Sequence, residues 1–586
     1  MRKRRQSREG DPAQGTQGHQ QRKGRRRVDR NAAAGDPVAR IRGDDEEEDD
    51  DAVELTESQE LSLEGIARVT VVEGCLNIQG FLLTSDEGAL TLCGNEGVGW
   101  PLRCRPVYRG EYNGPEHPER CLVRLESVSK DEESGVRYEA DSGARSGDAG
   151  NGGDPEAAPA RSPRRRTYNH RVSSSSDAPR PSGWSQCLEG LSEDLAESAT
   201  TSGSLSDLSV LVCGPKNAGK SSFCRELVNG LLNKTPIVAY LEADCGQPEF
   251  TPPGAISLTF VDAAVTGPPF MHPRRSQKSC FVGDTTPKTD PVVYLNSVVH
   301  LVDWYYNHGL KALQAHMETT SKGKAGSSGE ALSNLVPLVI NTPGWVKGLG
   351  FDILNRIVHH VQPHHIVQLC TNTAKDLPKD SADWKSLGLT VHQIGAHKHA
   401  APGGASAVDM RSLMWLSFCH QCVDAPLNLS ASVSDLFSLA ASHLCRACPY
   451  RVNLDDLRVV SPPDFDFPRE MVPQVLNASL VGLAKEADVQ ETQASAGGGS
   501  CHPFVGFGLV RSVDAENGEA FVLTNVGEEV LEEVGVVVLG SVKLPQQLLQ
   551  NATYQSPYVA HGAITVEGIG AGIIKGRNNM KRGRLN

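Results

Sequence analysis

The sequence predicts an α/β core with a parallel sheet, flanked by an N-terminal and a C-terminal β-rich domain. Three observations support this fold class. Between residues 207 and 450, short apolar runs alternate with helical stretches, as in a sheet covered by helices. In residues 59–129 and 451–560, short apolar runs are broken by glycine and other turn residues, which is typical of β-strands. A glycine-rich loop also joins the first apolar run of the core to its first helical stretch.

Composition and charge narrow the class of protein. The chain has 586 residues with 58 Lys plus Arg against 71 Asp plus Glu, a formal net charge of −13, so any nucleic-acid site must be local. No stretch approaches the roughly 18 apolar residues that cross a bilayer, and the basic N-terminus lacks the apolar segment of a signal peptide. We therefore expect no membrane segment, reduced thiols for the 15 cysteines, and a cytosolic or nuclear protein.

Two stretches have the composition of disordered chain. Residues 1–58 contain basic clusters at 2–5 and 22–27 and an acidic run at 44–51, and residues 130–206 are rich in Ser, Gly, Asp, Arg and Pro. The C-terminal tail, residues 561–586, is also basic. The two N-terminal clusters favour a nuclear or nucleolar address, with an RNA-binding arm or a solvated tail without a partner as alternatives.

The core begins with a strong phosphate-binding motif. The runs at 208–212, 237–241, 335–340 and 366–369 are the expected strands, and residues 214–221 match G-x-x-x-x-G-K-[ST] between the first run and a helical stretch at 222–232. In such a loop Lys220 reaches the β and γ oxygens of ATP, and Ser221 offers a hydroxyl to Mg²⁺. The alternative is a chance glycine-rich turn. The predicted ATP-binding residues are Gly214, Pro215, Lys216, Asn217, Ala218, Gly219, Lys220, Ser221 and Ser222.

Polar residues follow the next two strands at the edge where open α/β sheets bind ligands. Glu242 and Asp244 come directly after the strand at 237–241, so one can hold Mg²⁺ while the other orients or deprotonates an attacking group. The alternative is an ordinary acidic turn. Asn341 ends the strand at 335–340, where a GTPase would carry Asp in D-x-x-G, and no N-K-x-D element is present. These features argue against a GTPase.

Five segments together resemble the Clp-one and nucleolar polynucleotide 5′-hydroxyl kinase family. They are residues 214–223, 242–254, 267–270, 341–345 and 409–411, and the family's flanking β domains also match, so only the tails and the insertion fall outside. The resemblance implies a P-loop kinase core that moves the γ-phosphate of ATP to the 5′-hydroxyl of RNA. It further implies Mg²⁺, an endoribonuclease partner, and pre-rRNA processing for the large-subunit rRNA in the nucleolus.

The resemblance also assigns roles to individual residues. It makes Lys220 catalytic, Ser221, Glu242 and Asp244 the metal-side residues, and Asp244 the group that accepts or orients the proton of the 5′-hydroxyl. Arg411 falls where the family places a lid arginine, with a surface arginine on an amphipathic helix as the alternative. Glu242 stands where many relatives have Asp, and residues 525–527 replace an expected Thr-Pro-type turn. The implied acceptor-side residues are Gln247, Asp284, Lys288, Asn341 and Trp345.

Two rival functions and one metal site remain open. An ATP-binding scaffold of a nuclease complex needs no base opposite the γ-phosphate, and an ATPase motor predicts a helical domain after the core. The β-like C-terminal region argues against the motor. Two C-x-x-C pairs have the spacing of a zinc ribbon, with free thiols as the alternative that we favour. They are formed by Cys419, Cys422, Cys445 and Cys448.

Overall fold

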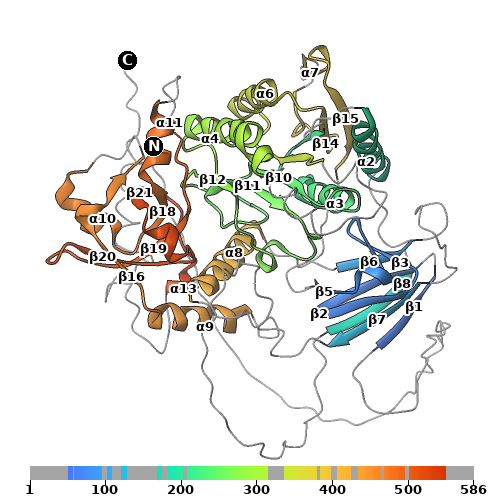
Figure 1. Ribbon diagram of the computed structural model, residues 1–586, viewed down its shortest axis with the longest axis horizontal. Coiled ribbons are helices and arrows are strands. Elements are labelled where there is room, and N and C mark those ends of the chain that lie inside the picture. The colour runs from blue at the N-terminus through green and yellow to red at the C-terminus, as the bar shows by residue number, and fades with distance from the viewer. Residues whose placement is uncertain are drawn as a thin grey trace, which may run out of the picture. The chain divides into compact units, whose positions relative to one another are not determined.

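The computed structural model describes residues 51–56, 59–94, 102–107, 121–127, 168–174, 183–201, 208–313, 335–378, 383–396, 406–423, 433–462, 467–494 and 501–549. These residues belong to one compact unit, Glu46–Asn586, and form three sheets (Figure 1). The basic clusters at 2–5 and 22–27 and the tail at 561–586 lie outside the described residues. In the described part of the chain, no helix has the length and apolar character needed to cross a membrane.

The central sheet has seven strands in the order β12-β11-β10-β13-β9-β14-β15. The five strands from β10 to β15 are parallel, but β11 and β12 run antiparallel to their neighbours, so the prediction of a parallel sheet is wrong at one edge. The chain passes from β10 to β11 through a loop without the crossover helix that a parallel neighbour requires. The strands are β9 (Ser209–Cys213), β10 (Val238–Glu242), β11 (Ala255–Val261), β12 (Lys278–Phe281), β13 (Leu338–Asn341), β14 (His365–Cys370) and β15 (Thr390–Gly395).

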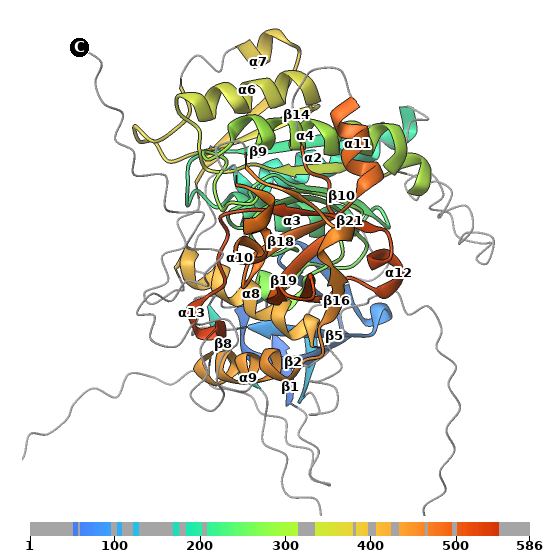
Figure 2. The ribbon, with the colours of Figure 1, turned by 90° about the vertical axis from the view of Figure 1, so that its left-hand side faces the viewer.

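Helices cover both faces of this sheet. In β9, Val210 and Val212 pack with α2 and α3, whereas Leu211 and Cys213 belong to the cluster that contains α4 and α6. Alternate side chains of a strand point to opposite faces, so each face acquires its own apolar core. The ribbons show α4 and α6 on one side of the sheet and α3 on the other (Figures 1 and 2). The helices are α2 (Trp184–Thr201), α3 (Lys220–Leu232), α4 (Pro291–Trp304), α6 (Leu349–Val361) and α7 (Asp383–Ser386).

The N-terminal sheet is antiparallel. Six strands follow the order β1-β7-β2-β6-β3-β4, and β5 and β8 both pair with β2. This part docks on the phosphate-loop helix through Asn233, the C-cap of α3, which accepts from the Leu82 N–H at 3.0 Å and donates to the Gly80 carbonyl at 2.9 Å. The strands are β1 (Asp51–Leu55), β2 (Gln59–Glu73), β3 (Cys75–Ile78), β4 (Phe81–Thr84), β5 (Ala89–Gly94), β6 (Leu102–Pro106), β7 (Cys121–Ser127) and β8 (Tyr168–Ser174).

The C-terminal part combines a six-stranded sheet, in the order β16-β20-β19-β18-β21-β17, with helices that join it to the core. Its apolar cluster includes Phe281 of β12 and most of the second half of α8, where every residue from 413 to 420 is buried. The strands are β16 (Tyr450–Asn453), β17 (Arg458–Val460), β18 (Leu480–Lys485), β19 (Gly506–Asp514), β20 (Glu519–Thr524) and β21 (Val534–Leu539). The helices are α8 (Ala407–Cys422), α9 (Val433–Arg446), α10 (Val472–Leu476), α11 (Glu486–Ala494), α12 (Glu528–Leu531) and α13 (Gln546–Leu549).

Predicted disorder is wrong for three segments. Within 1–58, β1 pairs with β7; within 130–206, β8 pairs with β2 and α2 packs on the core. Polar residues dominate the average composition there and hide these short elements. In α2 the buried residues recur at helical spacing, and they are Trp184, Cys187, Leu191 and Leu195.

Candidate active site

The phosphate loop has the backbone that its motif requires. It runs from the end of β9 into α3, with positive φ angles of 150°, 62° and 96° at Gly214, Asn217 and Gly219. A Cβ on Gly214 would lie 2.7 Å from the Leu369 carbonyl oxygen, so this position accepts no side chain. Gly219 is the N-cap of α3 and supplies no side-chain cap, which leaves the first N–H groups of the helix available to an anion.

Lys220 is already folded over this loop. Its side chain is 7 % exposed, and Nζ donates to the Pro215 carbonyl at 3.2 Å. Burial lowers the pKa of Lys220, and the charges of Asp244 and Glu242 oppose that decrease. The side chain of Lys220 is therefore held at the phosphate loop, where the carboxylates after β10 act on it electrostatically.

The two acidic residues after β10 occupy different environments. Glu242 is fully buried, and its carboxylate accepts hydrogen bonds from the backbone N–H of Asp244 at 2.9 Å and of Glu249 at 3.2 Å. Burial, followed by the charge of Asp244, raises the pKa of Glu242 well above its usual range. Asp244 is only partly buried, and one of its oxygens accepts from the Gly246 N–H at 2.9 Å. Asp244 is thus the more accessible carboxylate, and Glu242 lies behind it.

Asn341 connects Glu242 to the phosphate loop. Its Nδ2 lies 3.0 and 3.2 Å from the two oxygens of Glu242 and 3.3 Å from the hydroxyl of Ser221. The other amide atom, Oδ1, is buried and has no hydrogen-bond partner among the described residues. A hydroxyl, a spare amide oxygen and the carboxylate of Asp244 are oxygen ligands of the kind that Mg²⁺ and its bound waters use. These residues fit a magnesium ion.

The structure brings several predicted acceptor-side residues close together. Lys288 Nζ lies 5.3 Å from the centre of the Trp345 ring, a cation–π contact. Asp284 accepts from Thr289 at 2.6 Å and from Ser541 of the C-terminal part at 2.9 Å. The loop that carries Asp244 packs against the same turn: a Cβ on residue 246 would lie 2.5 Å from the Thr285 carbonyl oxygen, and Gln247 beside it is exposed.

Arg411 lies in the first turns of α8. The helix begins with a capping box in which Ser406 accepts from the Asp409 N–H and Asp409 accepts from the Ser406 N–H. Among the described residues no hydrogen bond or ion pair joins Arg411 to the phosphate loop. The helix itself contacts the short turn Pro269–Met271, so α8 and the segment at 267–270 are neighbours.

Three further polar residues, to which the sequence patterns assign no role, lie beside this site. Arg225 of α3 binds the carboxylate of Glu249 through Nε at 3.1 Å and Nη2 at 2.8 and 2.9 Å, and His272 Nε2 lies 2.8 Å from the same carboxylate. Arg225 and Glu249 are 4 % and 3 % exposed. Burial alone would raise the pKa of Glu249, but Arg225 and His272 outweigh burial and lower it. Arg225 follows Ser221 and precedes Asn229 on a polar stripe of α3, so the sequence pattern gave no signal that it would be buried.

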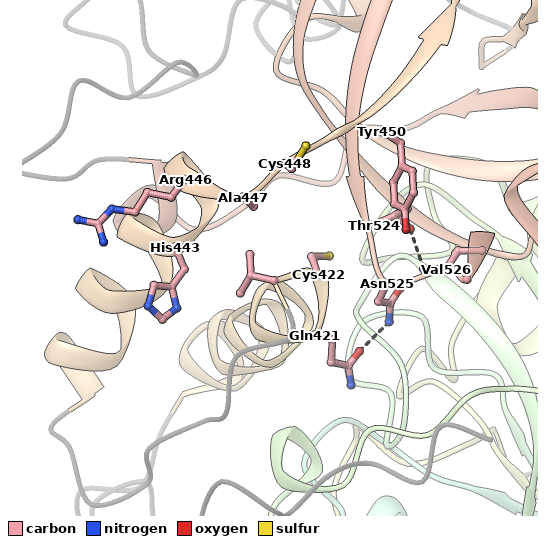
Figure 3. A pocket seen from close by; sticks show the side chains of 12 residues that line it. Gln421, Cys422, His443, Arg446, Ala447, Cys448, Tyr450, Thr524, Asn525 and Val526 are labelled. Atoms are coloured by element: carbon pink, nitrogen blue, oxygen red, sulfur yellow. Dashed lines mark hydrogen bonds between the residues drawn. The ribbon is translucent and has the colours of Figure 1, made fainter. Parts of the chain in front are cut away.

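A cavity of about 660 Å³ lies away from the phosphate loop, between the ends of α8 and α9 and the turn at 524–527 (Figure 3). Cys422 and Cys448 line it with His443, whereas Cys419 is buried in the core. Across the described ranges, no three His, Cys, Asp or Glu residues are grouped so that they can hold a metal ion. All four cysteines of the two C-x-x-C pairs are free thiols.

Comparison with known proteins identifies two family models. The model described as the P-loop of mRNA cleavage and polyadenylation factor CLP1 matches residues 214–399, and the one described as the NOL9-like C-terminal domain matches residues 445–545. These matches cover the phosphate loop, the end of β10, the Asn341 segment and the C-terminal sheet.

Several curated relatives share one name. Polynucleotide 5′-hydroxyl-kinase NOL9 of Arabidopsis thaliana is 34% identical over 384 residues, which cover 62% of this chain and 94% of that protein. The zebrafish protein of that name is 30% identical, covering 58% and 47%. The chain thus spans nearly all of the plant relative but about half of the zebrafish one. A solved Clp1p–Pcf11p complex is 15% identical, with a TM-score of 0.49, covering 85% of this chain and 99% of that one.

Proposed function

This chain belongs to the polynucleotide 5′-hydroxyl-kinase family that includes NOL9 and GRC3, and on that basis we propose that it transfers the γ-phosphate of ATP to the 5′-hydroxyl of RNA. One arrangement carries the proposal. The phosphate loop with Lys220 follows β9 and the partly exposed Asp244 follows β10, so both lie at the carboxyl edge of the same parallel strands. A phosphate anchor and a base on the same side are what transfer to a hydroxyl requires.

In this proposal the chain's residues divide the work as follows. The N–H groups of residues 214–222 and the ammonium of Lys220 bind the β and γ phosphates. Asp244 takes the proton of the 5′-hydroxyl while the hydroxyl oxygen bonds to the γ phosphorus. The bond between the γ phosphorus and the β–γ bridging oxygen breaks, and ADP leaves. Ser221 and Asp244 would hold Mg²⁺, together with Asn341, which was predicted on the acceptor side but lies against Ser221 and Glu242. The charge of the ion would neutralise the phosphate oxygens.

Glu242 was predicted on the metal side, but its contacts favour a role in orienting the residues that face the ligand. Both of its oxygens accept hydrogen bonds from protein groups, and its side chain has no exposed surface. Glu242 therefore orients Asn341 and the backbone of Asp244, which in turn face the ligand. Such an orienting carboxylate behind a metal-side group is common in metal sites.

The acceptor strand would lie along Gln247, Asp284, Lys288 and Trp345. Lys288, which lies over the ring of Trp345, would supply a positive charge for a backbone phosphate of that strand. Arg411 would act from α8 as a lid residue that stabilises the moving phosphoryl group. Its place on a helix that packs against the turn Pro269–Met271 supports this assignment.

We also propose a cellular setting: pre-rRNA processing in the nucleolus, beside an endoribonuclease whose cut creates the 5′-hydroxyl. Kinship with NOL9 and GRC3 proteins supports it, as do the basic clusters of the N-terminal tail. Those clusters would add salt-dependent affinity for RNA without sequence preference.

The rival function is an ATP-binding scaffold without catalysis. A scaffold has no need of an accessible carboxylate at the sheet edge that carries the phosphate loop, so the position of Asp244 after β10 favours an enzyme. The two functions separate in one assay, in which the chain is given labelled ATP and either 5′-hydroxyl or 5′-phosphate RNA. An enzyme labels only the 5′-hydroxyl RNA, whereas a scaffold binds ATP and labels neither.

A further inference from the structure

The buried pair Arg225 and Glu249 lies next to the reacting groups without facing them. Arg225 lies four residues after Ser221, one turn along the same face of α3. Glu249 lies five residues after Asp244, in the loop between β10 and β11. Their side chains meet through three hydrogen bonds between 2.8 and 3.1 Å, all inside the protein.

The backbone of Glu249 makes a second connection. Its N–H donates to Oε2 of Glu242 at 3.2 Å, and Glu242 accepts from Asn341, whose amide also lies 3.3 Å from the Ser221 hydroxyl. The contacts therefore form a closed ring. Starting at Ser221, it passes through Asn341, Glu242 and Glu249 to Arg225, and one helical turn returns to Ser221.

A third partner extends this ring towards the lid. His272 places Nε2 2.8 Å from Glu249 and Nδ1 3.2 Å from the Thr266 carbonyl oxygen. His272 caps the turn Pro269–Met271, which contacts α8, the helix of Arg411. The Glu249 carboxylate thus links the Asp244 loop, to which it belongs, with the phosphate-loop helix and with the turn that contacts α8.

We propose that Arg225 and Glu249 are positioning residues for phosphoryl transfer, tying the loop of Asp244 to the helix that carries Lys220 and Ser221. This inference rests on the proposed kinase function. Positions in a phosphoryl-transfer site must hold to a fraction of an ångström, and a displacement of about 1 Å can lower the rate by roughly 100-fold. The tie fixes the base relative to the phosphate without touching either.

Stability alone does not explain the pair. A buried ion pair pays a large desolvation cost, and replacing both partners by apolar side chains of similar size is often neutral or stabilising. A purely structural pair is therefore replaceable, whereas a positioning pair is not. The two roles predict different results for the same double substitution.

The test compares the wild type with the double variant Arg225→Met/Glu249→Gln, which removes both charges, nearly keeps the volume and leaves an amide that can still meet His272. The matched control is Lys278→Met/Asp488→Leu, a partly buried pair with an N–O distance of 3.0 Å between β12 and α11. The single variant Arg225→Lys keeps the charge and loses the two-pronged contact. Active sites are counted by stoichiometric Mg²⁺·ATP binding, and kcat and KM are measured with 5′-hydroxyl RNA.

We expect kcat of the double variant to fall about tenfold or more, with KM for ATP within about twofold and the thermal midpoint near that of the wild type. The control should keep its kcat, and Arg225→Lys should lie in between. A folded double variant with the kcat of the wild type, or one that loses ATP affinity as much as kcat, overturns the positioning role alone. A wild type that transfers no phosphate overturns the kinase function and this inference with it.

Discussion

The amide nitrogen of Asn341 donates to both carboxylate oxygens of Glu242, at 3.0 and 3.2 Å, although the two residues are 99 positions apart in the chain. The pair joins the ends of β10 and β13, which lie side by side in the sheet. Both side chains have 0 % exposed surface. The contact therefore links two strand ends of the site where water cannot replace it.

Asn341→Asp should destabilise the protein, because it replaces a buried donor by a second carboxylate facing Glu242. We expect the free energy of unfolding to fall by about 3–5 kcal/mol, the usual cost of an uncompensated buried charge. Denaturant unfolding measures it. Adding Glu242→Gln to this variant restores a hydrogen-bond donor and returns the net charge to that of the wild type, so it should recover part of the lost stability. An unchanged denaturation midpoint in Asn341→Asp would show that the contact is unimportant.

Gly344→Ala should weaken ATP binding. A Cβ at this position would lie 2.6 and 2.7 Å from the backbone Cα and N of Lys216, so the phosphate loop must move. We expect the Kd for Mg²⁺·ATP to rise about tenfold or more, measured by calorimetry. The control is Gly190→Ala in α2, where a Cβ meets nothing within 4 Å. That change should leave the Kd alone and stabilise the helix by about 0.5–1 kcal/mol, and equal Kd values for both variants would refute the clash.

Lys288→Ala should weaken RNA binding more than ATP binding, since its ammonium lies over Trp345 on the proposed acceptor side. We expect several-fold weaker binding of 5′-hydroxyl RNA and a smaller dependence of that affinity on salt concentration. Lys385→Ala, in α7 before β15, is the control for removal of an exposed lysine. Equal loss of RNA and ATP affinity in Lys288→Ala would contradict the acceptor-side assignment.

The capping box of α8 should make the free energy of unfolding depend on pH. Hydrogen bonds from the side chain and backbone of Ser406 hold the pKa of Asp409 below its usual range. A carboxyl whose pKa is lower in the folded than in the unfolded state adds stability above the unfolded value of about 3.9, and this contribution is lost as the pH falls through the folded value. The stability difference between wild type and Asp409→Asn should therefore shrink between pH 6 and pH 3. If urea unfolding gives the same difference in the free energy of unfolding at every pH, the hydrogen bonds of the capping box do not stabilise the protein through the charge of Asp409.

Local patterns were sufficient to predict the phosphate site. Each of the four expected core strands is present, with ends shifted by one to three residues, and the phosphate loop joins β9 to α3 as expected. The family resemblance is confirmed by the curated relatives. These features depend on contiguous residues, whose spacing alone determines a strand, a turn or a helix start.

The features that the sequence did not reveal depend on distant residues. Arg225 and Glu249 are 24 positions apart in the chain, and no sequence motif indicates that their side chains form a pair. Strand β8 lies within a polar insertion and pairs with β2, about a hundred residues earlier in the chain. A pattern within the insertion could not indicate that partner. At the antiparallel edge of the core, the length of the loop between β10 and β11 does not reveal in which direction β11 runs. A pattern within one window cannot show such pairings.

In the proposed function, Lys220 and Asp244 carry out phosphate transfer to a 5′-hydroxyl. The most direct measurement follows labelled γ-phosphate from ATP to a synthetic 5′-hydroxyl RNA, for the wild type, Lys220→Ala and Asp244→Asn, with a candidate nuclease partner added. We predict labelled RNA with the wild type and none with either variant, while Asp244→Asn still binds Mg²⁺·ATP. A wild type that binds Mg²⁺·ATP yet labels no RNA, with the partner present, would contradict the account and leave the scaffold as the function.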